Sequence, residues 1–112
     1  MLSRLMSKLT GASAAPTIEH EDFARVVQER SCAIVDVREA GEYASGHVPG
    51  AVNLPLSQFD PAKLPKGECV IICQAGGRSA KALGQAMQAG RTDVRHYAPG
   101  TGGWRARGGA GE

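Results

Sequence analysis

The stretch VIICQAGGRSAKAL, residues 70–83, holds the residues whose types and spacing are best suited to chemistry. Cys73 ends an apolar run just before a helix-forming segment, so its sulfur is expected near the free N–H groups of that helix's first turn. The helix dipole and the nearby Arg78 favour the thiolate, which is the nucleophilic form. Gly76 and Gly77 allow conformations in which successive N–H groups point inward and bind an anion. We therefore predict a nucleophilic cysteine in an anion-binding loop.

The competing interpretation of Cys73 is structural, because free cysteines are often buried and inert. A plain strand-to-helix turn needs neither two glycines nor an arginine, so the chemical interpretation is favoured. Cys32 and Cys69 lie within or beside apolar runs, and packing is the role expected for both. If residues 69–73 form a strand, Cys69 and Cys73 lie about 13 Å apart, well beyond the reach of a disulfide.

Three other kinds of site are weighed for this loop. A nucleotide P-loop is excluded because the sequence has no G-x-x-x-x-G-K-[ST]. A zinc site at Cys69 and Cys73 needs further ligands, and the three histidines show no metal spacing, so no metal is expected. A cysteine phosphatase holds five residues between cysteine and arginine to wrap a phosphate, whereas four separate Cys73 from Arg78 here. The smaller loop suits the terminal sulfur of a persulfide better than a phosphoryl group.

Strands and helices alternate in the segments that must position this loop. The apolar runs are short and unalternating, which is typical of strands buried on both faces. Such alternation predicts right-handed crossovers and an α/β domain with a parallel sheet, whose ligands gather where the strands end, as at Cys73. Residues 17–30 are expected to open with a short extended piece and to continue as an amphipathic helix with Phe23, Val26 and Val27 on one face. The sequence further predicts a helix at residues 79–89 and a short helix before Gly46. Strands are predicted within residues 32–37, 51–56, 69–73 and 93–98, and a glycine-rich segment at residues 99–109.

Length, charge and cysteine count exclude several classes of protein to which the chain could otherwise belong. A chain of 112 residues forms one domain, and a formal net charge of +2 with scattered basic residues indicates no nucleic-acid partner. No segment reaches the roughly 18 consecutive apolar residues of a membrane span. The odd set of three cysteines is no disulfide framework, so we expect a reduced, cytoplasmic protein.

The chain divides into three parts. Residues 1–15 are basic and carry no acidic residue, and are expected to form a flexible leader or weak amphipathic arm, with an organellar presequence as the alternative. The domain is expected over residues 16–108. Residues 109–112 are expected to be a loose tail.

Three motifs in this order resemble those of the rhodanese-like sulfurtransferases. CQAGGR, residues 73–78, matches the active loop C-x-x-G-x-R. Residues 34–56 resemble the upstream signature D-x-R-x-x-x-E-[YF]-x-x-G-H-[IV]-P-G-A-x-[NH], and PGTGGW resembles the later G-G-x-x-x-W, with Pro99 in place of the first glycine. The loop also resembles rhodanese domains that a membrane hairpin continues in some bacterial proteins, so the chain is a stand-alone relative or a piece of a longer one.

The resemblance implies a central five-stranded parallel sheet with helices on both faces, and a sulfur transfer without metal or cofactor. Cys73 would take the outer sulfur of a small anionic donor such as thiosulfate, hold it as a persulfide, and pass it to cyanide or a thiol acceptor, which is either a small molecule or a protein. The second hypothesis is a persulfide carrier or redox-sensing module with a protein partner and weak turnover. The persulfide-binding N–H groups implied are those of Gln74, Ala75, Gly76, Gly77, Arg78 and Ser79.

The remaining residues of the motifs have supporting roles. Asp36 is expected to accept local backbone hydrogen bonds and Arg38 to pair with Glu42. Arg78 either steers the anionic donor or braces the loop by bonding its carbonyls, and both roles are compatible. Trp104 is expected to pack near the loop, with a contact to the donor as the alternative.

For His47, and for Arg105 and Arg107, structural or surface roles are expected rather than functional ones. His47 is expected to make a structural hydrogen bond, because a thiolate that is already formed needs no general base. Arg105 and Arg107 are expected on an exposed turn, as solvated surface residues.

Overall fold

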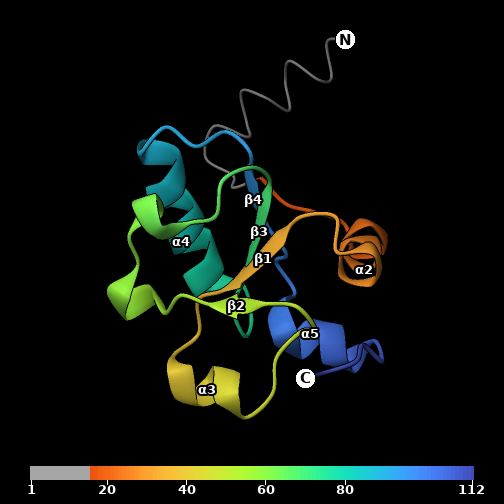
Figure 1. The fold of residues 1–112 in the computed structure, drawn as a ribbon. Helices are drawn as coiled ribbons and strands as arrows, with labels where there is room; N and C mark the ends of the chain where they lie inside the picture. Colours follow the sequence, from red (N-terminus) through yellow and green to blue (C-terminus); the bar gives the residue numbers. More distant parts are fainter. Residues whose placement is uncertain (1–15) are drawn as a thin grey trace, which may run out of the picture.

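The computed structural model describes residues 16–112, and the leader predicted at residues 1–15 lies outside the described residues. Helices and strands alternate along this part of the chain (Figure 1). The helices are α2 (His20–Glu29), α3 (Ala40–Ala44), α4 (Gly77–Gln88) and α5 (Gly100–Ala106), with 3-10 helices η2 (Leu56–Gln58) and η3 (Pro61–Lys63). The strands are β1 (Ala33–Asp36), β2 (Val52–Asn53), β3 (Cys69–Ile72) and β4 (Val94–His96). No helix within residues 16–112 combines the length and the apolar character that crossing a membrane requires.

The strands form one sheet in the order β2-β1-β3-β4, and all neighbours are parallel, which confirms the predicted α/β architecture. The sheet has four strands in the described residues rather than the five expected. The extended piece near Thr17 makes a single bridge to His96 beside β4. The His96 N–H donates to Pro16 O at 3.0 Å, and the Ile18 N–H donates to His96 O at 3.1 Å. Because α2 begins at His20, the chain leaves the edge before a further strand can form.

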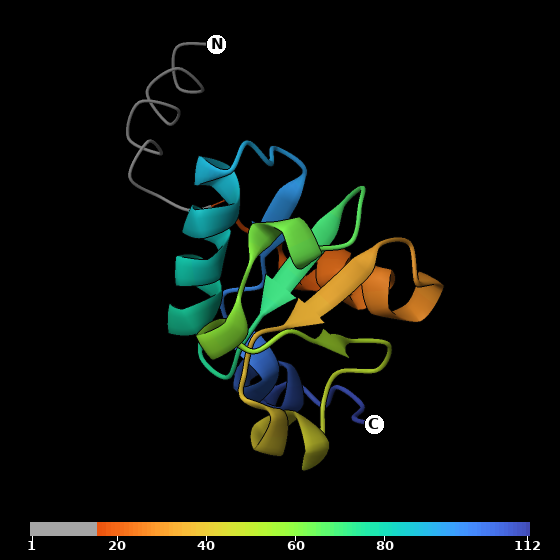
Figure 2. The ribbon, with the colours of Figure 1, turned by 60° about the vertical axis from the view of Figure 1, so that its left-hand side comes forward.

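Helices cover both faces of the sheet, as predicted (Figures 1 and 2). On the α4 face, the core contains the buried residues Val35, Ile71, Ala82, Leu83, Ala86 and Val94. On the opposite face, where α2 and α5 pack, the core contains Phe23, Val26, Ile34, Val70, Ile72 and Trp104. Strands β1 and β3 therefore face a core on both sides, which explains why their apolar residues do not alternate with polar ones.

Two helices near the cysteine loop differ from the sequence prediction. Helix α4 begins at Gly77 rather than at residue 79, because Gly76 adopts a left-handed conformation (φ 99°) as its N-cap. The glycine-rich segment, whose end was expected to be an exposed turn, forms helix α5, and Arg105 lies in this helix with its side chain exposed. Pro99 fits immediately before α5, because its φ is −63° and the start of a helix leaves backbone N–H groups without partners in any case.

The last four residues, for which a loose tail was expected, make specific contacts. The Glu112 N–H donates to His47 O at 2.7 Å, and the His47 N–H donates back to Glu112 O at 3.2 Å. The Trp104 indole N–H donates to Ala110 O at 2.7 Å. The tail thus packs along the segment that follows α3 and along α5.

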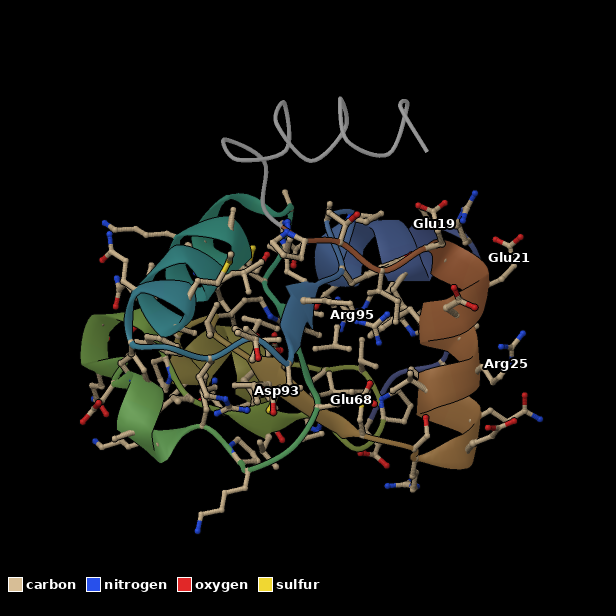
Figure 3. All side chains as sticks on the ribbon, turned by 90° about the horizontal axis from the view of Figure 1, so that it is seen from above. Glu19, Glu21, Arg25, Glu68, Asp93 and Arg95 are labelled. Atoms are coloured by element: carbon tan, nitrogen blue, oxygen red, sulfur yellow. The ribbon has the colours of Figure 1, made fainter. Side chains whose placement is uncertain are left out.

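The two ends of the strands differ in character. Helices α3 and α5 lie beside the edge where β1 and β3 end (Figures 1 and 2), and Cys73 follows β3 at this edge. The opposite edge, seen in Figure 3, carries charged side chains. Glu68 precedes β3 and pairs with Arg95 at 3.5 Å, and Asp93 precedes β4 and pairs with Arg91 at 2.8 Å. The length of the strands separates this charged edge from the cysteine loop.

Candidate active site

Cys73 is 1% exposed and lies between β3 and the loop that leads into α4. The Gly76 N–H donates to Cys73 Sγ at 3.0 Å, and Ser79 Oγ lies 3.5 Å from the same sulfur. Burial raises the pKa of the Cys73 thiol, but hydrogen bonds from the Ser79 side chain and from the N–H groups of Ser79, Ala75 and Gly76 outweigh burial and lower the pKa overall. The surroundings therefore favour the thiolate, as predicted, and Ser79 supplies a side-chain donor that the sequence interpretation did not assign.

The two loop glycines have different roles, although both were expected to provide unusual backbone conformations. Gly76 has a φ of 99°, and a Cβ at this position would collide with Ala98 O. Gly77 is the first residue of α4, and a Cβ there would meet nothing within 4 Å. The bend that places the Gly76 N–H on the sulfur depends on Gly76 alone, so the prediction for Gly77 is wrong.

The first turn of α5 holds the cysteine loop by its carbonyl groups. The Thr101 N–H donates to Cys73 O at 2.8 Å, and the Gly102 N–H donates to Gln74 O at 3.0 Å. Gly100 permits this close approach, because it has a φ of 68° and a Cβ there would lie 2.6 Å from Cys73 O. Since the C=O and the following N–H of a planar trans peptide point in opposite directions, the two bonds turn the N–H groups of Gln74 and Ala75 away from α5.

Arg78 binds Glu42 of α3 through both terminal nitrogens, at 2.6 and 2.9 Å. This hydrogen-bonded pairing lowers the pKa of Glu42 to about 2 and raises the pKa of Arg78. The expected pairing of Glu42 with Arg38 is therefore wrong. Arg38 lies two residues after Asp36 and turns to the same side of the chain, whereas Glu42 faces α4.

Asp36 and Arg38 form a buried ion pair at the end of β1, with Arg38 Nη2 and Asp36 Oδ2 2.8 Å apart. Asp36 also accepts the Arg38 backbone N–H at 2.9 Å, the local bond predicted for it. Arg38 donates to Gly46 O at 2.8 Å and to Gln74 Oε1 at 3.5 Å. The Asn53 amide donates to the carbonyls of Asp36 and Arg38, each at 2.9 Å. Asn53 thus connects β2 to the end of β1, and Arg38 connects the same end of β1 to the segment after α3. Arg38 also contacts the cysteine loop at Gln74.

Trp104 and His47 make packing contacts. The Trp104 ring packs edge-on against Phe23 of α2, with ring centroids 5.3 Å apart, in the core on the α2 face. His47 Nδ1 lies 3.0 Å from Tyr43 O, and its ring stacks on that of Tyr43 at 3.8 Å between centroids. The structural hydrogen bond expected for His47 is thus present.

Cys32 and Cys69 differ from Cys73 in their surroundings. All three cysteines are free thiols. Burial is the main cause that raises the pKa of Cys32 and of Cys69, although Arg91 partly offsets it at Cys69. Cys32 packs against the core on the α2 face and Cys69 is part of the core on the α4 face, which agrees with the packing role predicted for both. Within residues 16–112, no three histidine, cysteine or acidic side chains gather as a metal site.

His96 is a site residue that the sequence interpretation missed. Its Nδ1 lies 2.8 Å from Ser79 Oγ, which connects β4 to the hydroxyl beside the Cys73 sulfur. His96 is 5% exposed, and burial lowers its pKa. A polar residue within the otherwise apolar end of strand 93–98 was the available signal, although it does not identify Ser79 as the partner.

The family model "Rhodanese-like domain" matches residues 19–107. A structure titled "Human Single Domain Sulfurtranferase TSTD1" superposes with a TM-score of 0.71 at 30% identity, covering 84% of this chain and 98% of that chain. Human thiosulfate:glutathione sulfurtransferase is 31% identical over 103 residues, covering 77% of this chain and 90% of that protein.

Other relatives are longer than this chain. The putative sulfur carrier protein YrkF of Bacillus subtilis is 34% identical over 100 residues, which is 86% of this chain and 54% of YrkF. The uncharacterized protein slr1261 of Synechocystis is 35% identical over 95 residues, 82% of this chain and 53% of that protein. The chain thus spans about half the length of these two relatives.

Proposed function

Since this chain belongs to the rhodanese-like domain family, we propose that it is a sulfurtransferase with Cys73 as its catalytic residue. It moves sulfane sulfur from thiosulfate or a persulfide donor, through a persulfide on Cys73, to cyanide or a thiol. The observation that carries the proposal is the set of donors on the Cys73 sulfur, together with the lowered pKa of its thiol. The names of the human relatives support a transferase with a thiol acceptor.

In the first half-reaction, the Cys73 thiolate attacks the outer sulfur of the donor. A new S–S bond forms at Cys73, the S–S bond of the donor breaks, and sulfite leaves with that electron pair when thiosulfate is the donor. The persulfide's terminal sulfur lies within the loop, where inward N–H groups stabilise its negative charge. The N–H groups proposed for this role belong to Gln74, Ala75, Gly76, Gly77, Arg78 and Ser79.

In the second half-reaction, an acceptor thiolate attacks the terminal sulfur and the Cys73 thiolate leaves. The donors that lower the pKa of Cys73 also make it a better leaving group, so they assist both halves. Such a covalent relay predicts ping-pong kinetics. With three free cysteines, the protein suits a reducing compartment, and we place it in the cytoplasm.

A persulfide carrier that serves a protein partner is the second candidate. The name of YrkF favours it. In addition, the two arginine side chains near the loop are both paired with carboxylates, Arg38 with Asp36 and Arg78 with Glu42. Neither offers an unpaired positive charge to the thiosulfate dianion, which favours a donor with less charge.

Intact-protein mass measured after thiosulfate treatment tests the proposal. We expect one added sulfur atom that is removed by cyanide or a thiol, retained in Cys69→Ser and absent in Cys73→Ser. Fast turnover with thiosulfate and cyanide supports the enzyme. A stable persulfide that only a protein thiol discharges supports the carrier. Unchanged sulfur uptake in Cys73→Ser refutes both.

A further inference from the structure

Ser79 Oγ has three polar neighbours in the interior of the protein. His96 Nδ1 lies 2.8 Å away, Gly76 O 3.2 Å away and Cys73 Sγ 3.5 Å away. Ser79 itself is 0% exposed, so water does not compete for its hydroxyl group. Since a hydroxyl carries one proton, only one of these neighbours receives it at a time.

The position of the ring proton on His96 decides whether His96 itself accepts that hydroxyl proton. If the imidazole carries its proton on Nε2, Ser79 donates to Nδ1 and has no proton left for the sulfur. If the proton is on Nδ1, His96 donates to Ser79 Oγ, and the hydroxyl proton is left for Gly76 O or for Cys73 Sγ, of which the charged thiolate is the stronger acceptor. Because burial lowers the pKa of His96, the ring carries a single proton near neutral pH, and the two arrangements exclude each other.

We propose that His96 carries its proton on Nδ1, donates a hydrogen bond to Ser79 Oγ, and thereby leaves the Ser79 hydroxyl proton available to the Cys73 thiolate. His96 is then a positioning residue of the sulfur site that acts through Ser79. The inference rests on the proposed function for its consequence, because the donor increases the fraction of Cys73 present as thiolate and makes that thiolate a better leaving group.

The sheet holds His96 in place for this role. Its backbone N–H and C=O bond to Pro16 and Ile18 on one side of β4, and the Tyr97 N–H donates to Ile71 O on the other. The His96 side chain lies on the α4 face of the sheet, where Ser79 meets it (Figure 1 shows α4 beside β4). The ring is thus fixed by β4 and the hydroxyl by α4, so their distance follows from the packing of a helix on a strand.

Other charged groups near the sulfur are already paired. Arg78 of α4 binds Glu42 of α3, and Arg38 after β1 binds Asp36. The β4 neighbours Arg95 and Tyr97 alternate with His96 and project to the other face. Substitution of His96 therefore leaves these ion pairs intact.

The Ser79 hydroxyl group assists the second half-reaction, in which the Cys73 persulfide gives up its outer sulfur. Once the terminal sulfur has taken a proton from water, an acceptor thiolate attacks the outer sulfur of Cys73–S–SH. The Sγ–S bond breaks with its electron pair on Cys73 Sγ, and the acceptor leaves as a persulfide that keeps the proton. The hydroxyl proton of Ser79, donated to Sγ, stabilises the charge that develops there. A hydroxyl turned toward His96 or Gly76 would give no such help.

Nitrogen NMR of the histidine-labelled protein tests the ring proton directly. We expect the chemical shifts of His96 to show a protonated Nδ1 and an unprotonated Nε2. The opposite assignment would overturn the proposal without any need for a variant.

His96→Leu and His96→Asn form a matched pair, because the two side chains have nearly the same shape and only asparagine can donate near the Nδ1 position. We expect Cys73 alkylation by iodoacetamide near neutral pH to be about fivefold slower in His96→Leu and close to wild type in His96→Asn. In a Ser79→Ala background, His96→Leu should add nothing, because His96 acts through Ser79. Equal alkylation in both His96 variants, or additive effects, would contradict the proposal, and if His96→Leu does not fold, the NMR assignment decides.

These measurements use no sulfur donor, so they are independent of the proposed function. A protein that takes no sulfur yet shows the His96 effect on alkylation refutes only the function. A protein that transfers sulfur but keeps wild-type alkylation in His96→Leu refutes only the role of His96.

Discussion

Alanine should be harmful at Gly76 and tolerated at Gly77, although the two residues are adjacent and chemically identical. Gly76 adopts a left-handed conformation, and its Cβ would collide with Ala98 O. Gly77 begins α4 with open space around the Cβ position. The pair therefore tests whether the loop depends on one specific backbone bend or on general flexibility.

The magnitude follows from two costs at Gly76. A left-handed conformation costs an alanine about 1–2 kcal/mol. Moving the backbone to relieve the contact with Ala98 costs about 1–3 kcal/mol, as for other overpacked sites. We expect Gly76→Ala to lower the free energy of unfolding by about 3 kcal/mol. Gly77→Ala should leave it unchanged or raise it by up to about 1 kcal/mol, because alanine favours a helix more than glycine does.

Urea unfolding measures the stabilities, and Cys73 alkylation reports the loop, because the Gly76 N–H donates to the sulfur at 3.0 Å. In Gly76→Ala we expect both lower stability and slower alkylation near neutral pH, whereas Gly77→Ala should match wild type in alkylation. Equal losses in the two variants would refute the reasoning. So would a Gly76→Ala protein with wild-type stability and thiol reactivity.

Three further predictions follow from the charged groups and the thiol. The pKa of Glu42 is lowered from 4.5 to about 2, so its pairing with Arg78 stabilises the fold above pH 4.5 and is lost as the pH falls through about 2. Glu42→Gln should lower stability near neutral pH by only about 0.5–1 kcal/mol, because the Glu42 side chain is 40% exposed, and the difference from wild type should vanish in acid unfolding. Asp36→Ala should cost about 3–5 kcal/mol in urea unfolding, because it leaves Arg38 buried without its partner, and a loss below 1 kcal/mol would contradict this. The alkylation rate of Cys73 plotted against pH should have its midpoint below the free-thiol value of about 8.5, since its pKa is lowered, and a midpoint at or above that value would refute the account of its donors.

The parts of the site that could be predicted from the sequence are contiguous in the chain. Cys73, the bend at Gly76 and helix α4 fall within one short segment, so the order of residue types indicates their arrangement, although α4 begins two residues earlier than predicted. The buried strands were also predictable, because uninterrupted apolar runs indicate burial on both faces. The position of Cys73 at the end of β3 follows from these two facts alone.

The parts that were missed depend on partners distant in sequence. Glycine has low helix propensity, so residues 100–106 gave no helix signal, yet α5 forms with its N–H groups on the carbonyls of Cys73 and Gln74. Glu42 has two arginines within reach, and spacing alone does not identify Arg78 as its partner. The contact between His96 and Ser79 requires knowing how α4 packs on β4.

The cysteine loop is held by contacts on its carbonyl side as well as by the bend at Gly76. Gly76 supplies one bend, but the carbonyls of Cys73 and Gln74 are held by α5, and this fixes the opposite side of the same peptides. Because each planar peptide carries its C=O and N–H in opposite directions, binding the carbonyls outward commits the next N–H groups inward. If the loop binds a persulfide as proposed, these N–H groups are already positioned for it and need no reorganisation when negative charge develops there. The later glycine-rich motif, which carries no reactive group, thus helps to shape the loop around Cys73.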